Sequence, residues 1–297
     1  MNQYSKKLLY LSQINNTPIC KLKIFDIEEE KCFTQKLYLK VIKTLSGISQ
    51  LNINNTLYLC GINEINNDNN SVGSYMFKIK YSNFNPSLFF LVNSVYTHIY
   101  PSMSLWKNEI IIIIGGKDQI ECEGYLINQS KWIDLPPLPE DRFKCSLLLD
   151  EKNDLIYLFG GLSSITNNNM KNILKLNMDL IDKWEMILIK ENESLLGRNS
   201  SICFMFENSN IVFICGGNNN NNEETDYICE YNIERKTIKN SKFSMKINCS
   251  FDMQGFGDLN KNHFAFIDKA FNVHTFSRND FRINVIPFDQ VSIDQKD

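Results

Sequence analysis

An apolar run that ends in two glycines recurs along this chain. The clearest copy is NEIIIIIGGKD, Asn108 to Asp118, in which five consecutive isoleucines precede the glycines. Comparable apolar runs end near residues 12, 61, 116, 161, 217 and 267, so that the average spacing is about 50 residues. Self-similarity at such a period is typical of repeat architectures. Six units of this length account for the 297 residues, and they predict a single repeat domain over residues 1–297.

Each unit contains further strands around the apolar run. Downstream come a short alternating strand, a polar turn and a second strand with an aromatic or apolar residue, as in GYLINQSKWIDL at residues 124–135. The turn in this copy is typical of a tight hairpin. Upstream, FKCSLLLD (Phe143 to Asp150) and SSICFMF (Ser200 to Phe206) have the composition of another strand. A full unit therefore has four strands, named a to d in chain order, and the glycine pair closes strand b.

The order of these landmarks resembles the kelch repeat, which has a period of about 50 residues. An apolar strand ends in a glycine pair, a tyrosine or similar residue follows on the next strand, and a tryptophan comes about seven residues later. The matching residues are Gly115, Gly116, Tyr125, Trp132, Gly160, Gly161, Trp184, Gly216, Gly217 and Tyr231, with a partial match at Gly61. In the copy with Tyr231, Thr237 stands where the tryptophan belongs. The resemblance implies an all-β fold, a six-bladed kelch-type β-propeller with four-stranded antiparallel blades.

The physical requirements of a propeller agree with these residue types. Neighbouring blades cover both faces of a central strand, so that such a strand is a continuous apolar run. Glycine after the run permits a positive φ and a close approach of another backbone segment. The chain begins directly at a strand b, so another segment must supply strand a of the first blade. We expect a last strand d at about Arg282 to Ile286, and beyond it Gln290 to Asp294 as the C-terminal strand that closes the ring.

Charge and hydropathy disfavour several classes of partner. The net charge of −3 at pH 7 gives no general attraction to nucleic acid or to anionic lipid. No apolar run approaches the roughly 18 residues of a membrane helix, and Leu8 to Leu11 is too short for the core of a signal peptide. The nine cysteines include no CxxC pair, which favours buried free thiols in a reducing compartment. These features predict a cytoplasmic protein, with the nucleus as the other location.

No catalytic motif is recognisable. GGKD lacks the GxxxxGK spacing and the Ser or Thr of a phosphate-binding loop, and no GxSxG elbow is present. His98, His263 and His274 are far apart in the sequence, and no other pattern indicates a metal site. We therefore expect no enzyme activity, no cofactor and no metal. The alternative is a kelch-fold enzyme that acts on a small sugar acid, similar to the mutarotases, with Arg and Glu residues at the mouth of the channel.

Chain direction predicts where a partner binds. Strands alternate in direction, so the bc and da loops emerge on one face and the ab and cd loops on the other. The long insertions are the bc loops at 63–74, 162–171 and 218–226 and the da loops at 136–143 and 190–200. All of them fall on one face, where functional loops on a rigid scaffold are expected, and we expect a monomer that binds a protein or peptide there. The asparagine runs at 167–169 and 218–222 are interpreted as polar insertions with nothing to bury.

Three basic residues are candidates for partner binding on this face. Arg142 and Arg198 precede strand a of two consecutive units, and Lys246 has a comparable place in the next unit. In kelch adaptors, basic residues at such places bind acidic motifs, so the resemblance implies this role here. The alternative is that the arginines pair with nearby acids, such as Glu140 or Glu193, and hold their loops in place. The resemblance also implies substrate recognition for ubiquitin ligation, or a cytoskeletal scaffold, and the sequence does not distinguish between them.

Overall fold

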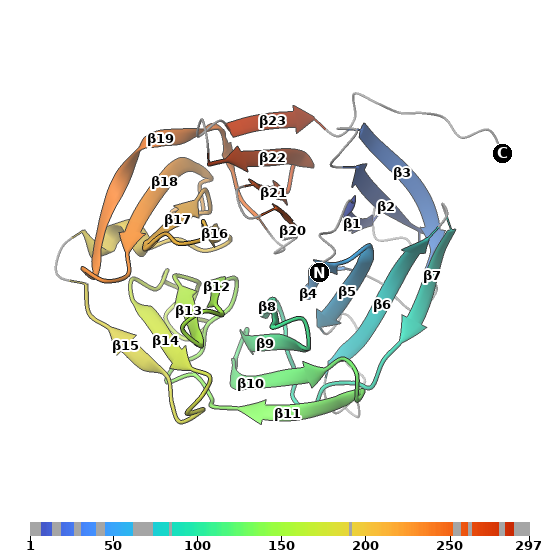
Figure 1. The fold of residues 1–297 in the computed structure, drawn as a ribbon, viewed down its shortest axis with the longest axis horizontal. Coiled ribbons are helices and arrows are strands. Elements are labelled where there is room, and N and C mark those ends of the chain that lie inside the picture. The colour runs from blue at the N-terminus through green and yellow to red at the C-terminus, as the bar shows by residue number, and fades with distance from the viewer. Residues whose placement is uncertain are drawn as a thin grey trace.

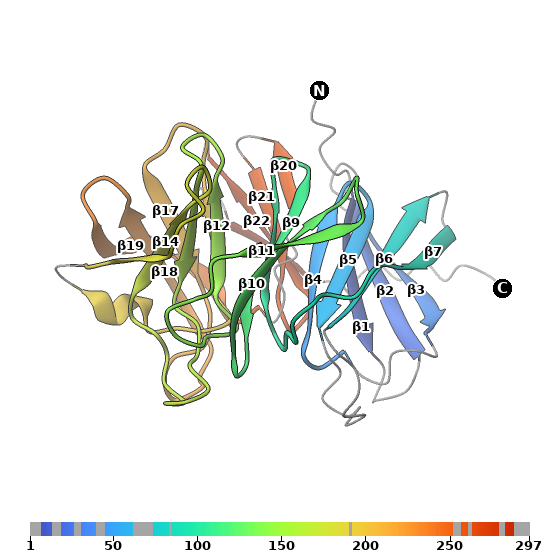
Figure 2. The ribbon, with the colours of Figure 1, turned by 90° about the horizontal axis from the view of Figure 1, so that it is seen from below.

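Six antiparallel sheets surround a central axis, which is the architecture of a six-bladed β-propeller (Figure 1). The computed structural model describes residues 7–13, 19–26, 31–39, 45–61, 74–82, 85–189, 192–251, 257–260, 263–278 and 283–287. Seen from the side, the strands run across the thickness of the ring (Figure 2). Within these residues the only helical element is one 3-10 turn, η1 (Glu193–Leu196), and no helix is long and apolar enough to span a membrane. The predicted all-β, six-bladed fold is confirmed.

The blades follow one another in chain order. Blade 1 contains β1 (Lys7–Gln13), β2 (Ile19–Asp26) and β3 (Lys31–Tyr38), and blade 2 contains β4 (Ile48–Ile53), β5 (Thr56–Gly61), β6 (Tyr75–Ser82) and β7 (Asn85–Phe90). Blade 3 contains β8 (Ser102–Trp106), β9 (Ile110–Gly116), β10 (Gln119–Leu126) and β11 (Lys131–Leu135), and blade 4 contains β12 (Ser146–Asp150), β13 (Leu155–Phe159), β14 (Ile173–Asn177) and β15 (Glu185–Ile187). Blade 5 contains β16 (Ile202–Met205), β17 (Ile211–Cys215), β18 (Thr225–Asn232) and β19 (Thr237–Cys249), and blade 6 contains β20 (Gly257–Asn260), β21 (His263–Ile267), β22 (Asn272–Ser277) and β23 (Ile283–Pro287). In blades 2 to 6 the first strand lies nearest the axis and the last lies outermost (Figure 1).

The isoleucine run of β9 is apolar throughout because two blades cover it. Ile112 and Ile114 belong to a core cluster shared with blade 4, whereas Ile111 and Ile113 pack in a cluster shared with blade 2. Side chains of a strand alternate between its two faces, so each face of β9 meets a different neighbour. A continuous apolar run is therefore what this position requires, and the period-2 alternation of a half-exposed strand is absent for that reason.

The glycine pairs mark a close approach between backbones. At the end of β9, Gly115 has a φ of 57°, and a Cβ at this position would lie 2.7 Å from the carbonyl oxygen of Arg142. The amide of Gly116 donates to that same oxygen over 3.1 Å. An equivalent contact joins the pair after β17 to the carbonyl of Cys249, again at 2.7 Å from a Cβ added to Gly216. The predicted positive φ and close approach are confirmed, and the approaching segment is the one that leads into the next blade.

Two tryptophans join neighbouring blades. Trp132 on β11 donates from Nε1 to the carbonyl of Val92 in the preceding blade over 2.9 Å, and Trp184 donates to the carbonyl of Pro136 over 2.8 Å. The strand register pairs Tyr125 with Trp132 and, at the corresponding place in blade 5, Tyr231 with Ile238. The tryptophan position of blade 5 is thus occupied by Ile238, and the expectation that Thr237 stands there is corrected by one residue.

Blade 1 has three strands among the described residues, and side chains of blade 2 satisfy its inner edge. Gln50 accepts from the amide of Leu11 over 2.9 Å and donates to the carbonyl of the same residue over 2.7 Å. Asn52 donates to the carbonyl of Lys7 over 2.9 Å. The assignment of β1 as a strand b stays a prediction, because the residues before Lys7 lie outside the described part of the chain. The predicted closing strand, Gln290 to Asp294, lies outside the described residues.

Blades 1 and 6 meet through an apolar cluster. Leu8 and Tyr10 of β1 pack in one buried group with Ala265, Ile267 and Val273 of blade 6. The last described strand, β23, begins one residue after the place predicted for it. Packing between side chains therefore contributes to ring closure in the part of the chain that the structure describes.

All nine cysteines are buried and free of disulfides, as predicted from their spacing. Burial raises the pKa of Cys20 to about 11 and that of Cys122 to about 12. Such thiols stay protonated near neutral pH and pack as small hydrophobic residues.

Candidate functional site

A belt of hydrogen bonds runs part-way round the axis, from the entry of blade 2 to the entry of blade 6, where the da loops lead into the innermost strands. The belt consists of Gly47, Tyr100, Lys144, Ser200 and Phe251. Each of the last four donates its amide to the carbonyl of the member before it, over 2.9, 3.2, 2.9 and 2.7 Å in chain order. The first four members have positive φ angles of 80°, 54°, 55° and 54°. The left-handed backbone turns each loop so that one blade is joined to the next at the same height.

A second set of bonds runs beside the belt and uses serine hydroxyls. The three bonds are Ser49 Oγ to the carbonyl of Pro101 at 2.6 Å, Ser102 Oγ to the carbonyl of Cys145 at 2.9 Å, and Ser146 Oγ to the carbonyl of Ser201 at 2.8 Å. Each serine lies at or near the start of an innermost strand and donates to the following blade. Buried hydroxyl groups with satisfied hydrogen bonds fix the relative position of the strands that carry them.

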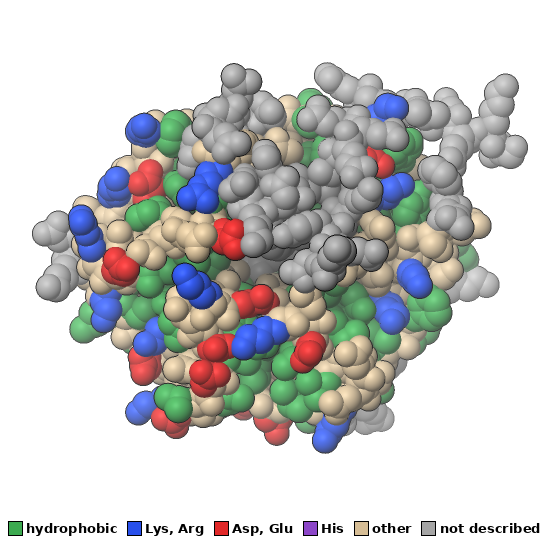
Figure 3. Space-filling view, in the orientation of Figure 1, with side chains coloured by type: hydrophobic (Ala, Val, Ile, Leu, Met, Phe, Trp, Pro, Cys, Tyr) green, Lys and Arg blue, Asp and Glu red, His purple; other side chains and the backbone are tan. Residues whose placement is uncertain are grey.

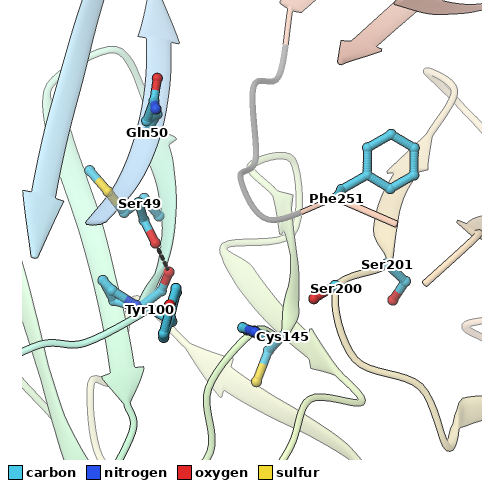
Figure 4. A pocket seen from close by; sticks show the side chains of 10 residues that line it. Ser49, Gln50, Tyr100, Cys145, Ser200, Ser201 and Phe251 are labelled. Carbon is cyan, nitrogen blue, oxygen red and sulfur yellow. Dashed lines mark hydrogen bonds between the residues drawn. The ribbon is translucent and has the colours of Figure 1, made fainter. Parts of the chain in front are cut away.

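A small pocket lies beside the belt (Figure 4). Tyr100, Lys144, Ser200 and Phe251, from successive blades, contribute to its lining. Its volume is about 10 Å³, which is room for roughly one water molecule. Lys144 is the one lining residue that carries a charge at neutral pH, and its ammonium lies 4.6 Å from the ring centroid of Tyr100. This pocket is therefore too small to hold an organic ligand as it stands.

The loops outside the belt are joined to one another. Asp141, in the loop between blades 3 and 4, accepts from Ser163 Oγ over 3.2 Å and from the amide of Ser164 over 2.7 Å. Ser164 Oγ also accepts from the amide of Asp118 in the turn after β9 over 3.0 Å. These bonds join one da loop and two bc turns into one surface. We call this surface, together with the asparagines described next, the loop platform.

Three asparagines extend the loop platform to blade 5. Asn169 donates from Nδ2 to the carbonyls of Gly197 and Asn218, both over 3.1 Å, and its Oδ1 accepts from Asn199 over 2.8 Å. Asn169, Asn199 and Asn218 are buried. The interpretation of the asparagine runs as insertions with nothing to bury is wrong for Asn169 and Asn218, because both are buried and the side-chain amide of Asn169 donates to the carbonyl of Asn218 in the next blade.

The outer part of the platform is exposed. Ile165, in the bc turn of blade 4, is 84% exposed, and the polar residues 220–224 in the bc turn of blade 5 are also exposed. A large apolar side chain on a turn that is held in place by its neighbours is available for contact with another protein.

Arg142 and Arg198 lie inside the molecule. Arg142 is 0% exposed and donates from Nη2 to Glu140 over 2.6 Å, while its Nε and Nη1 have no hydrogen-bond partner within the described residues. Arg198 is 5% exposed and donates from Nη1 to the carbonyls of Gly216 and Tyr227, both over 3.0 Å. For Arg142 this is the internal pairing that the sequence offered as the alternative to partner binding.

The internal roles also follow from position in the repeat. His98, Arg142 and Arg198 each lie two residues before a member of the belt. His98 is buried, with Nδ1 2.6 Å from the carbonyl oxygen of Gly115 and Nε2 2.9 Å from Glu123 Oε2. In these three repeats, the residue two before the belt therefore has a polar side chain that bonds the da loop to other groups of the protein.

Lys246, the third candidate, is exposed on the outermost strand of blade 5, β19. Unlike the two buried arginines, it belongs to the outermost strand of its blade. The structure thus separates the three residues that the sequence grouped together: two contact the protein itself, and one is accessible at the outer edge of a blade. The side chain of Glu193 lies outside the described residues.

A second buried histidine is paired with a carboxylate in blade 6. His274 Nε2 lies 2.7 Å from Asp268 Oδ2, and Asn272 donates to the same carboxylate. Burial alone would raise the pKa of Asp268, but the hydrogen bonds from His274 and Asn272 outweigh it, so that the pKa is lowered. No group of three or more His, Cys, Asp or Glu residues that could hold a metal ion occurs among the described residues.

The belt and the serine bonds were not predicted, although the sequence contains a weak signal for them. Gly47, Tyr100 and Lys144 each precede by two residues a serine that bonds to the next blade. A single serine at such spacing is too common to indicate a contact, and its partner is a carbonyl more than 40 residues away.

No protein-family model matches the sequence, and a search of curated proteins finds no match. The class that the structure defines is the six-bladed β-propeller. This fold commonly serves as a scaffold for protein interactions, although a fold alone does not assign a function.

Proposed function

We propose that this chain is a kelch-type propeller and a non-catalytic protein-interaction module that binds a protein or peptide partner on the loop platform. The observation that carries the proposal is the platform itself: neighbouring bc and da loops are hydrogen-bonded into one surface that presents exposed residues. A preorganised surface loses less conformational entropy on binding than separate mobile loops do. The kelch resemblance, with its glycine pairs and inter-blade tryptophans, supports the same role.

The alternative function is a kelch-fold enzyme that acts on a small sugar acid. Such an enzyme needs side chains in the channel that can hold a carboxylate and move a proton. The two arginines that could hold a carboxylate are buried against the protein. This observation favours the binding role. A thermal-shift screen with sugar acids at about 10 mM distinguishes the two functions, because an enzyme's substrate stabilises the folded state and raises its melting temperature.

The proposed partner is a protein rather than a nucleic acid. On the face that Figure 3 shows, acidic and basic side chains are interspersed, with no extended surface of one sign among the described residues. Binding to nucleic acid depends on a concentrated positive surface. The proposed location is the cytoplasm, with the nucleus as the other compartment, and the roles of ubiquitin-ligase substrate recognition and cytoskeletal scaffolding both fit this kind of surface.

Matched variants of blade 4 test the proposed surface. Ile165→Glu with Lys171→Glu changes the bc loop on the platform, whereas Leu180→Glu with Lys152→Glu likewise replaces an exposed apolar residue and an exposed lysine by glutamate on the opposite face. The tagged protein and both variants are purified from cells that express it, and the recovered proteins are quantified by mass spectrometry.

We expect the platform variant to reduce recovery of the specific partners at least about fivefold, since an acidic side chain in an apolar contact costs several times RT. The opposite-face variant is expected to retain them. Equal recovery with both variants, at equal thermal stability, would refute the platform as the binding surface.

Closure of the ring by residues 290–294 remains part of the proposed kelch architecture. Deletion of residues 288–297 is expected to lower the melting temperature by several degrees, because a paired strand contributes hydrogen bonds and buried surface. An unchanged transition would show that the contacts of Gln50, Asn52 and the apolar cluster between blades 1 and 6 suffice for closure.

A further inference from the structure

The junction between blades 4 and 5 differs from the two junctions before it. Trp132 and Trp184 each donate to a carbonyl just beyond the outermost strand of the preceding blade. At the corresponding place in blade 5, the strand register puts Ile238 opposite Tyr231. Isoleucine has no side-chain donor and is smaller than tryptophan. The outer part of this junction therefore lacks the indole that bonds the two blades at each of the earlier junctions.

A groove lies along this junction, between β15 and the turn that connects β18 to β19. Its volume is about 410 Å³, within the range of pockets that bind ligands or side chains. Apolar side chains from both blades line it, among them Tyr157, Ile187 and Ile233. Leu188 and Met186 also line it and are 78% and 50% exposed. A partner that covers these side chains removes apolar surface from water, which favours binding.

The charges at the groove favour an acidic ligand. Glu185, the one carboxylate in the lining, bonds to Lys175 over 2.7 Å. The hydrogen bond and charge of Lys175, together with the charges of Lys183 and Lys236, lower the pKa of Glu185. Lys236, which also lines the groove, is exposed. The lining thus carries two lysines and one carboxylate, and that carboxylate is already bonded to Lys175.

One edge of β15 offers backbone groups beside these side chains. This three-residue strand pairs with β14 along one edge, and it is the last strand of its sheet, so its other edge is unpaired in the described part of the chain. Figure 1 places β15 at the outside of the ring. An extended peptide can add to such an edge through main-chain hydrogen bonds while its side chains enter adjacent pockets.

We propose that this groove binds an extended acidic segment of a partner protein, which pairs with the free edge of β15, inserts an aromatic or large aliphatic side chain between Leu188 and Ile233, and directs a carboxylate to Lys236. The site is separate from the loop platform, because it is formed by side chains of β13 to β15 and of the cd turn after β18, and it shares no residue with the platform. It would give the propeller a second peptide-binding surface.

The test uses a random 12-residue peptide library displayed on phage and panned against the immobilised full chain. Enriched sequences are synthesised with a fluorescent label, and their dissociation constants are measured by anisotropy for the wild type and for Leu188→Asp and Lys236→Glu. The matched controls are Leu180→Asp, at a site that is 74% exposed outside the groove, and Lys171→Glu on the loop platform. Thermal unfolding verifies that all four variants fold.

We expect enriched peptides to place an aromatic or large aliphatic residue next to Asp or Glu. We also expect Leu188→Asp and Lys236→Glu to weaken their binding at least about tenfold, with the controls within about twofold. The proposal is overturned if no sequence is enriched over a blank surface, or if the enriched peptides bind Leu188→Asp and Lys236→Glu as tightly as the wild type. Peptides that lose binding with Lys171→Glu alone would overturn the groove and support the loop platform instead.

Discussion

Substitution of the first glycine in the isoleucine stretch, Gly115→Ala, should destabilise the protein by about 3 to 5 kcal/mol. The φ of 57° costs a residue with a Cβ about 1 to 2 kcal/mol. The added Cβ would lie 2.7 Å from the carbonyl oxygen of Arg142 and 2.8 Å from a methyl group of Leu138. Moving that backbone carbonyl breaks its bond to Gly116, worth about 1 kcal/mol, and the crowding adds about 1 to 2 kcal/mol.

The control for this experiment is Gly124→Ala in the same blade. Gly124 has no positive φ, and its added Cβ would meet only side-chain atoms of Ile110 and Ile133, which can move. We expect a loss below about 1.5 kcal/mol there. Urea unfolding followed by tryptophan fluorescence gives both free energies. If Gly115→Ala is no more destabilising than Gly124→Ala, the explanation of the glycine pair by a close backbone approach is refuted.

Three further predictions concern side chains inside the ring. Trp184→Phe removes an inter-blade hydrogen bond and should lower the free energy of unfolding by about 1 kcal/mol more than Trp106→Phe does. Trp106 is a buried tryptophan whose indole makes no such bond to the described residues, and equal losses in urea unfolding would contradict this prediction. Arg198→Ala should lower the free energy of unfolding by about 3 kcal/mol, because it removes hydrogen bonds to two buried carbonyls. Lys246→Ala on the surface should change it by less than about 0.5 kcal/mol. A larger loss for Lys246→Ala than for Arg198→Ala would refute the internal role of Arg198. Asp268 has a lowered pKa in the folded state, so it stabilises the protein above its unfolded pKa of about 3.9 and loses this effect as the pH falls through the folded pKa. Stability measured from about pH 5 to pH 2 should therefore fall less steeply for Asp268→Asn, and parallel curves would count against the pairing.

The repeat could be predicted from the sequence because its signal is local. The apolar run of strand b recurs in all six units, and in three of them a glycine pair follows where the next blade's entry segment approaches, as at Gly115. These requirements act on neighbouring residues, so they recur at a fixed period that can be measured without a structure. The spacing of the apolar runs thus predicted the number of blades.

The candidate site was harder to predict because its contacts join distant parts of the chain. Arg142 and Arg198 have the same position in two repeats, and sequence alone does not tell whether such a guanidinium points outward or into its own blade. The structure places both inside, against Glu140 and against the carbonyl of Gly216. The one-residue error at Thr237 has a similar cause, since the length of the turn before it sets which residue faces Tyr231.

The asparagine runs show a third limit. Composition describes them as polar and repetitive, which is typical of exposed insertions. Asn169 nevertheless bridges Gly197 and Asn218, which lie 28 and 49 residues further along the chain. Such a role depends on which loops the ring brings together, and no local property of the run indicates it.

The most direct test of the proposed function is hydrogen exchange on the complex with a partner recovered by affinity purification. Amide exchange is measured by mass spectrometry for the free protein and for the complex. Partner binding on the loop platform should slow exchange in the bc turns at 162–169 and 218–224 while leaving the cd turns at 178–184 and 233–236 unchanged. Protection confined to the cd turns, or to neither set, would contradict the assignment of the loop platform as the binding surface.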